Sequence, residues 1–325
     1  MFFARPRTFL LLALAASAVL GFFQNQIDPY YVDVLTRIGI NIVLAVSLNL
    51  INGHTGQFSL GHAGFMAVGA YTAAAVTMFA GPHVLPVNAP TIIIMLWFLV
   101  ALLAGGAMAA AAGLLVGAPS LRLKGDYLAI VTLGFGQIIS VIFRNIEPLG
   151  GALGLNKIPS YTNLFWAFGA AAVTVYVITA MVNSTYGRGF IATHDDEIAA
   201  EAMGINTTRC KIVAFVIGAF FAGIAGGLYG HFELSISPRG FDFNKSVEIV
   251  VMVIVGGMGN TLGVVLAAIL LTLLPEGLRM LSGVSPSLHW IGESRLLLYS
   301  LLLIAMMLLR PQGLFNFRKS ARTKV

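Results

Sequence analysis

The side chains best suited to chemistry in this sequence lie in one polar run, residues 186–208, which reads YGRGFIATHDDEIAAEAMGINTT. Two of its carboxylates, Glu197 and Glu201, are one helical turn apart and share a face. No Ser-His-Asp, Cys-His or paired-carboxylate arrangement falls in a plausible pocket anywhere in the chain, which argues against an enzyme. We therefore interpret the run as a surface for binding another protein.

The local signals in this run predict one short helix, Thr193–Gly204. Thr193 can cap its N-terminus, acidic residues occupy the first turn, and Gly204 supplies a C-terminal stop. Ile198, Ala202 and Ile205 form a small apolar stripe. A helix this short cannot bury much surface against lipid, which favours docking into another protein. The alternative is a solvated amphipathic helix in a loop.

Histidine and cysteine give no support for a metal centre or a cofactor. His54 and His62 lie in the glycine-rich segment 52–64, NGHTGQFSLGHAG, without carboxylate or thiolate neighbours. Cys210 is the only cysteine, so an internal disulfide is impossible and no thiolate cluster can form. We expect neither a metal nor a cofactor.

Composition places the chain in the membrane. Hydrophobic residues make up 58% and charged residues 10%, whereas soluble domains carry about 25% charged residues. Apolar segments of spanning length recur from end to end, and nothing resembles a separate soluble domain, so 1–325 is expected to be one transmembrane domain. The net charge of +6 is no signal for nucleic acid, because the basic residues lie between and after apolar segments.

The predicted fold class is all-α, a polytopic membrane bundle of about ten transmembrane helices. A cleaved signal peptide is the alternative for the first span, and the glycine turn Gly256–Asn260 divides residues 247–274 into two short arms, either of which could be re-entrant. The expected spans are 8–23, 34–51, 59 or 61 to about 80, 91–116, 126–143, 164–182, 211–229, the two arms of 247–274, and 296–309.

Polar residues inside the spans indicate a translocation pathway. Asn41, Asn49 and Asn52 fall near one face of the second span and are expected to point into the bundle. Thr132 and Gln137 lie near two mid-membrane glycines of the fifth span, which mark either a tight helix crossing or an irregular segment lining the pathway. These five residues are the candidate pathway residues.

Basic residues set the expected orientation. With about ten spans and the N-terminus inside, 12 basic residues fall on the inner side and seven on the outer side or near it. Both termini, the Thr193–Gly204 helix and a basic tail, residues 310–325, are then cytoplasmic. Treating 247–274 as one span would send this tail outside, so charge favours the split.

Four segments together resemble the membrane permease of a branched-chain amino acid ABC importer. They are NGHTGQFSLGHAGFMAVGAY, LRLKGDYLAIVTLGFGQI, EIAAEAMGIN and VGGMGNTLG, in the family's order, and the resemblance spans roughly residues 34–315. The second segment and the chain length resemble the LivM-type member of the two paralogous permeases. The spacing from Glu201 to Gly204 is tighter than in the family's general signature.

The resemblance implies a transport subunit of the bacterial inner membrane that is not itself an enzyme. Its partners would be a second, homologous permease, two ABC ATPases and a periplasmic substrate-binding protein. The chain has no GxxxxGK[ST] phosphate loop, so ATP must be bound by another subunit. The family's cytoplasmic coupling helix, which engages the ATPases, would correspond to Arg188, Asp196, Glu197, Ala199, Ala200, Glu201, Ala202 and Gly204.

Three other readings stay open. A urea or short-amide ABC permease is the nearest, because related systems share the GQFSLGH-like loop. A secondary transporter would need an ion-coupling acid near mid-bilayer, and the only acid found in the predicted spans is Glu248, close to a membrane edge. A purely structural membrane subunit is the third.

Overall fold

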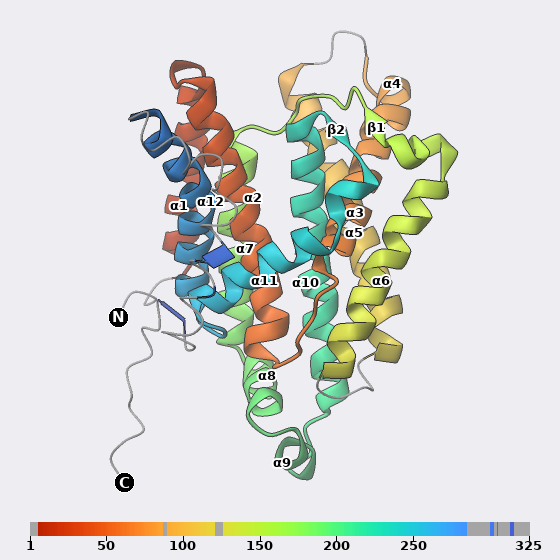
Figure 1. Ribbon diagram of the computed structural model, residues 1–325, viewed down its shortest axis with the longest axis vertical. Coiled ribbons are helices and arrows are strands. Elements are labelled where there is room, and N and C mark those ends of the chain that lie inside the picture. The colour runs from red at the N-terminus through yellow and green to blue at the C-terminus, as the bar shows by residue number, and fades with distance from the viewer. Residues whose placement is uncertain are drawn as a thin grey trace.

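A computed structural model describes residues 6–86, 90–120, 126–284, 300–301, 304 and 313–314. The described chain is a helical bundle with one short antiparallel pair of strands (Figure 1). Its longer helices are α1 (Pro6–Phe23), α2 (Pro29–Asn49), α3 (His62–Ala75), α5 (Thr91–Ser120), α6 (Asp126–Asn145), α7 (Leu164–Val182), α8 (Thr185–Asp195), α10 (Thr207–Glu233), α11 (Phe243–Gly256) and α12 (Thr261–Val284). The short helices α4 (Gly81–Val84) and α9 (Glu197–Ala202) complete the α-helices.

Seven helices in the described part of the chain are long and apolar enough to cross a membrane. They confirm an all-α, multi-pass membrane protein. α1 has 18 residues and packs against α7, and α11 has only 14. The expected number of about ten spans stays a prediction. Its last member, 296–309, lies almost entirely outside the described residues, and so does the basic tail 310–325.

The predicted division of 247–274 is confirmed. α11 ends at Gly256, and Gly257 and Gly259 follow with φ of 90° and 78°, values that L side chains rarely adopt. α12 then runs through Pro275 to Val284, well past the predicted end of that arm. A proline inside a helix removes one N–H donor, which neighbouring protein groups can compensate within a membrane bundle.

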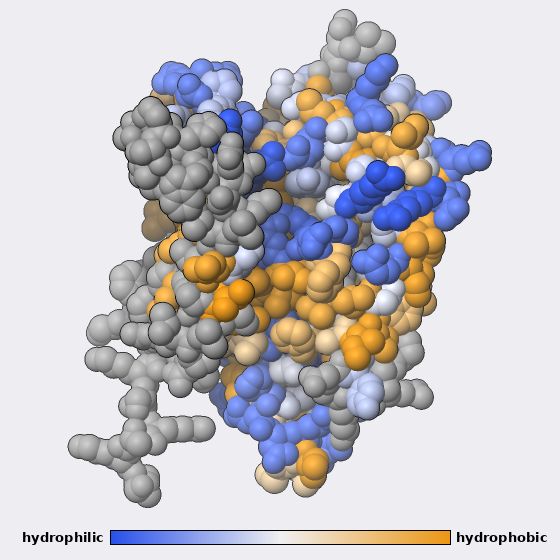
Figure 2. Space-filling model, in the orientation of Figure 1, coloured by the Kyte–Doolittle hydropathy of each residue, from blue (hydrophilic) through white to orange (hydrophobic). Residues whose placement is uncertain are grey.

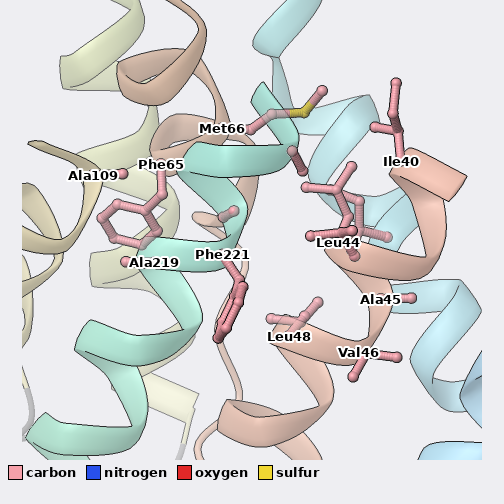
Figure 3. Packing of buried hydrophobic residues seen from close by; sticks show 14 of the residues in the cluster. Ile40, Leu44, Ala45, Val46, Leu48, Phe65, Met66, Ala109, Ala219 and Phe221 are labelled. Atoms are coloured by element: carbon pink, nitrogen blue, oxygen red, sulfur yellow. The ribbon is translucent and has the colours of Figure 1, made fainter. Parts of the chain in front are cut away.

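The core is organised around α10, which packs against α5, α3 and α2. Its small residues Gly218, Ala222 and Gly226 are buried, and a Cβ atom at Gly226 would collide with the carbonyl of Met66. These small residues, spaced four apart, let neighbouring helices approach α10 closely. Figure 3 shows side chains of the same core, with Phe65 beside Ala219 and Leu48 facing Phe221.

The middle of the glycine-rich segment 52–64, residues 55–61, lies in the bundle as non-helical backbone. α2 continues as a π-helical turn, Leu50–His54, and residues 56–61 are irregular until α3 begins. Side chains of other helices satisfy the amides here: Leu60 N donates to Thr132 Oγ1 (3.1 Å), and Ala63 N, in the first turn of α3, donates to Ser246 Oγ (3.2 Å). Irregular backbone at membrane depth is tolerated where protein satisfies it, so the segment is a packed structural element.

The two ends of the bundle differ. α8 and α9 lie at one end, at the bottom of Figure 1, and the antiparallel pair β1 (Leu155–Asn156) and β2 (Ser235–Ile236) lies at the other. Figure 2 shows hydrophobic residues across the middle of this face and hydrophilic residues over the α8–α9 end. This distribution matches a bundle that crosses a bilayer and exposes α8 and α9 to water.

Candidate functional site

The polar run folds into two helices rather than one. α8 starts after Ser184, whose Oγ accepts from Gly187 N (3.4 Å), and α9 starts after Asp196, whose Oδ1 accepts from Ile198 N (2.9 Å) and Ala199 N (3.0 Å). The prediction of one helix beginning at Thr193 was therefore wrong. Asp196 has an extended backbone, φ −157°, and its carboxylate satisfies two donors of α9.

Thr193 has a different role from the predicted cap. It lies buried inside α8, where its Oγ1 donates to the carbonyl of Gly189 (2.7 Å). The predicted C-terminal stop is confirmed. Gly204 has φ +82°, and the amide of Ile205 donates back to the Ala200 carbonyl (3.0 Å). α8 and α9 together, with the stop at Gly204, are called the α8–α9 unit below.

The carboxylates of α9 point toward the bundle. Lys211 Nζ lies 2.6 Å from Glu197 Oε1, and these side chains are only 10% and 25% exposed. Thr207, the first residue of α10, donates its hydroxyl hydrogen to Glu201 Oε1 (2.7 Å). Both carboxylates also lie at the N-terminal end of α10, where the helix dipole favours negative charge. The shared face therefore fastens α9 to the most central helix of the bundle.

A different face of the α8–α9 unit points to solvent. Ile198 is 74% exposed and Met203 is 83% exposed, so two large apolar side chains of this short unit have no partner surface within the described chain. The other members of the predicted coupling set divide between the two faces. Ala200 is buried, whereas the exposed members are Arg188, Asp196, Ala199, Ala202 and Gly204. Met203 was missed by the sequence reasoning, although its position just before the Gly204 stop leaves it little to pack against.

The α8–α9 unit rests on the two glycine-rich segments. A Cβ atom at Gly56, φ +69°, would lie 3.0 Å from Cδ2 of His194. Asn49 Oδ1 accepts from Gly259 N (2.9 Å), and a Cβ atom at Gly53 would collide with that same amide nitrogen. The segments at 52–64 and 256–260 thus meet each other directly beneath α8. A cleft of about 420 Å³ between them and the end of α8 leaves room for relative movement.

The structure also locates the five candidate pathway residues. Asn49, Asn52 and Thr132 are buried and hold the backbone of the glycine-rich segments, with Asn52 Oδ1 accepting from Ser59 N (3.2 Å). Gln137 is exposed on α6. Asn41 is buried and donates to Thr272 Oγ1 (2.9 Å) beside a cavity. A role in translocation stays a prediction for all five.

Comparison with known proteins gives a consistent result. The family model described as the permease component of branched-chain amino acid transport systems matches residues 30–309. The chain is 35% identical over 318 residues to the high-affinity branched-chain amino acid permease LivM of Escherichia coli K12, covering 87% of this chain and 69% of that protein. LivM of Salmonella typhimurium is 34% identical over 339 residues (94% and 74%), and LivH of Salmonella typhimurium is 22% identical over 248 residues (70% and 78%).

Proposed function

The chain belongs to the branched-chain amino acid transport permease family, and on that premise we propose that it is one transmembrane half of an ATP-driven importer of branched-chain amino acids. The observation that carries the proposal is the α8–α9 unit. It links two spanning helices, α7 and α10, at one end of the bundle, and it presents Ile198 and Met203 to solvent. Exposed apolar residues of this kind suit the groove of a partner protein.

The proposed contact with the ATPases differs in detail from the predicted one. Ile198 and Met203, with the exposed neighbours Ala199 and Ala202, form the surface that docks on the ATPase. Glu197 and Glu201 act behind this surface, because their carboxylates bind Lys211 and Thr207 of the same chain. Their contribution to coupling is to hold the docking surface in place.

Two contacts can carry movement of the α8–α9 unit into the membrane. The Glu197–Lys211 pair connects α9 with α10, which contacts α2, α3 and α5. His194 lies against Gly56, and the glycine-rich segments below connect to α2 and α12. ATP-driven closure of the ATPases would then shift packed helices and change access to the pathway, as in other rigid-body transitions.

The family also supplies the expected assembly. The partners are a second, homologous permease, two ABC ATPases and a periplasmic binding protein, in the bacterial inner membrane with both termini cytoplasmic. The match to LivH, itself a branched-chain amino acid permease, supports a paralogous second subunit. No ATP-binding loop occurs in the sequence, so ATP hydrolysis belongs to the partners.

Reconstitution tests this function. The chain is purified with the permease, ATPases and binding protein encoded beside it, and radiolabelled leucine uptake into proteoliposomes is measured with ATP or with an ion gradient alone. Uptake that requires ATP and the binding protein, and that urea does not compete for, is expected. Gradient-driven uptake without ATPases would establish a secondary transporter, and uptake of urea in place of leucine would establish the amide alternative.

A further inference from the structure

A cavity of about 150 Å³ lies between α2, α3, α10, α11 and α12. It belongs to the half of the bundle away from the α8–α9 unit, because Arg37 on its wall pairs with Glu233, the last residue of α10, at 2.7 Å. Its volume is below the roughly 300–1,000 Å³ of pockets for drug-sized ligands, so any occupant is a small solute.

The cavity wall carries both signs of charge. Arg37 comes from α2, Lys245 and Glu248 from α11, and Glu276 from α12. Glu276, like Asp33 and Glu233, lies inside a candidate membrane span, so the expectation that Glu248 is the only acid in the spans was wrong. The cause is that α2, α10 and α12 extend past the ends of the predicted spans. Ionisable residues inside membrane spans usually mark a functional site, and two cations with two anions match a solute that carries both charges.

The remaining wall is apolar and offers uncharged acceptors. Ile40, Met66 and Leu271 are buried and line one side, and Figure 3 shows Ile40 and Met66 at the same end of the buried cluster. Asn41 uses its Nδ2 on Thr272. Pro275 has no N–H, so the carbonyl of Leu271 loses its helical donor. The combination is a charged half facing an apolar half.

We propose that this cavity binds an apolar α-amino acid in its zwitterionic form. Its carboxylate is held by Arg37 and Lys245, its ammonium group by Glu248 and Glu276, and its side chain by the apolar wall. The proposal rests on the importer function given above and names a substrate site within the permease itself.

The competing explanation is that these charges only fasten helices together. Lys245 and Glu248 are 2.9 Å apart on α11, and Glu276 accepts a hydrogen bond from Tyr30 Oη (2.7 Å) and lies 4.0 Å from Arg279. Packing contacts account for each pair separately. They do not account for cations and anions from three helices around one cavity with an apolar wall. The experiment must therefore measure selectivity as well as stability.

Three ligands with the same branched side chain distinguish recognition of the carboxylate from recognition of the ammonium group. Labelled leucine is bound to the purified complex of permeases and ATPases without binding protein, and competed with 4-methylpentanoate, which lacks the ammonium group, and with 3-methylbutylamine, which lacks the carboxylate. Glu248→Gln is expected to weaken leucine and 3-methylbutylamine binding about ten- to a hundredfold and leave 4-methylpentanoate unchanged, since it removes a charged hydrogen-bond partner. Lys245→Gln is expected to weaken leucine and 4-methylpentanoate and leave 3-methylbutylamine unchanged.

Glu147→Gln is the matched control, because Glu147 is an exposed acid in the loop after α6 and outside the cavity. If Glu248→Gln prevents assembly, Glu276→Gln is used instead and is expected to weaken the binding of leucine and 3-methylbutylamine in the same way. Equal weakening of all three ligands, or no leucine binding to a wild-type complex that imports leucine, would overturn the cavity site. A wild-type complex without ATP-driven uptake would instead overturn the importer function, so the two failures are distinguishable.

Discussion

Loss of Lys211 should uncouple ATP hydrolysis from uptake. Hydrogen bonds to charged groups contribute about 1.5–3 kcal/mol, and breaking a fully buried ion pair costs about 3–5 kcal/mol. Lys211 and Glu197 are 10% and 25% exposed, so the pair lies between surface and interior, and we expect Lys211→Met to cost about 2 kcal/mol. That loss lowers the ratio of fastened to released α9 about 30-fold.

The assay is the ratio of ATP hydrolysed to leucine imported in proteoliposomes. Lys211→Met should raise this ratio severalfold while the complex still assembles, because the spans do not depend on α9. Arg209→Met is the matched control, since Arg209 is an exposed cation on the same turn of α10. The exchange Glu197→Lys with Lys211→Glu should restore part of the coupling. A wild-type ratio in Lys211→Met would refute the idea that this pair transmits movement.

Three further outcomes follow from the geometry. Ile198→Asp places a charge on the exposed docking surface, so it should leave folding within about 0.5 kcal/mol but abolish ATPase stimulation by the binding protein; normal stimulation would exclude Ile198 from the interface. Glu201→Lys puts a cation beside the α10 N-terminus and should likewise uncouple transport, which the same hydrolysis-to-uptake ratio measures, and wild-type coupling would contradict it. Gly61→Val drives a Cβ atom into the carbonyl of Thr132 and should reduce the amount of folded complex recovered, whereas normal yield and uptake would disprove tight packing there.

Orientation can be measured independently. Met203 is 83% exposed, so a cysteine introduced by Met203→Cys in a Cys210→Ser background is accessible to a thiol reagent. Thr193 is buried and is a poorer position for labelling. We expect an impermeant thiol reagent to label it only from the cytoplasmic side. Labelling from the periplasmic side in intact cells would invert the proposed topology.

The sequence predicted long apolar elements well and short polar ones less well. α7 runs from Leu164 to Val182 as predicted, because an uninterrupted apolar segment has one obvious helical solution. The break between α8 and α9 was missed, because Thr193 and Asp196 are both good caps and only the backbone shows which one is used.

The face of α9 was predicted, but not what it contacts. Spacing alone put Glu197 and Glu201 on one side, and the partner on that side, Lys211, lies on the next helix. The cavity proposed for the amino acid was not predicted at all. Its charges come from α2, α11 and α12, and no local pattern reveals that Arg37 and Glu276 share a wall.

The irregular segment between α2 and α3 has a consequence for how the chain is made. The amides of Leu60, at its end, and of Ala63, in the first turn of α3, find their acceptors in Thr132 and Ser246, which lie 72 and 183 residues later in the sequence. At a synthesis rate of about 5–20 residues per second, the second acceptor emerges roughly 10–40 s after the segment. Bare amides are costly in hydrocarbon, so α2 and α3 must wait beside water or a chaperoning protein until α11 arrives. A helix made late in synthesis, α11, therefore completes one made early, α3.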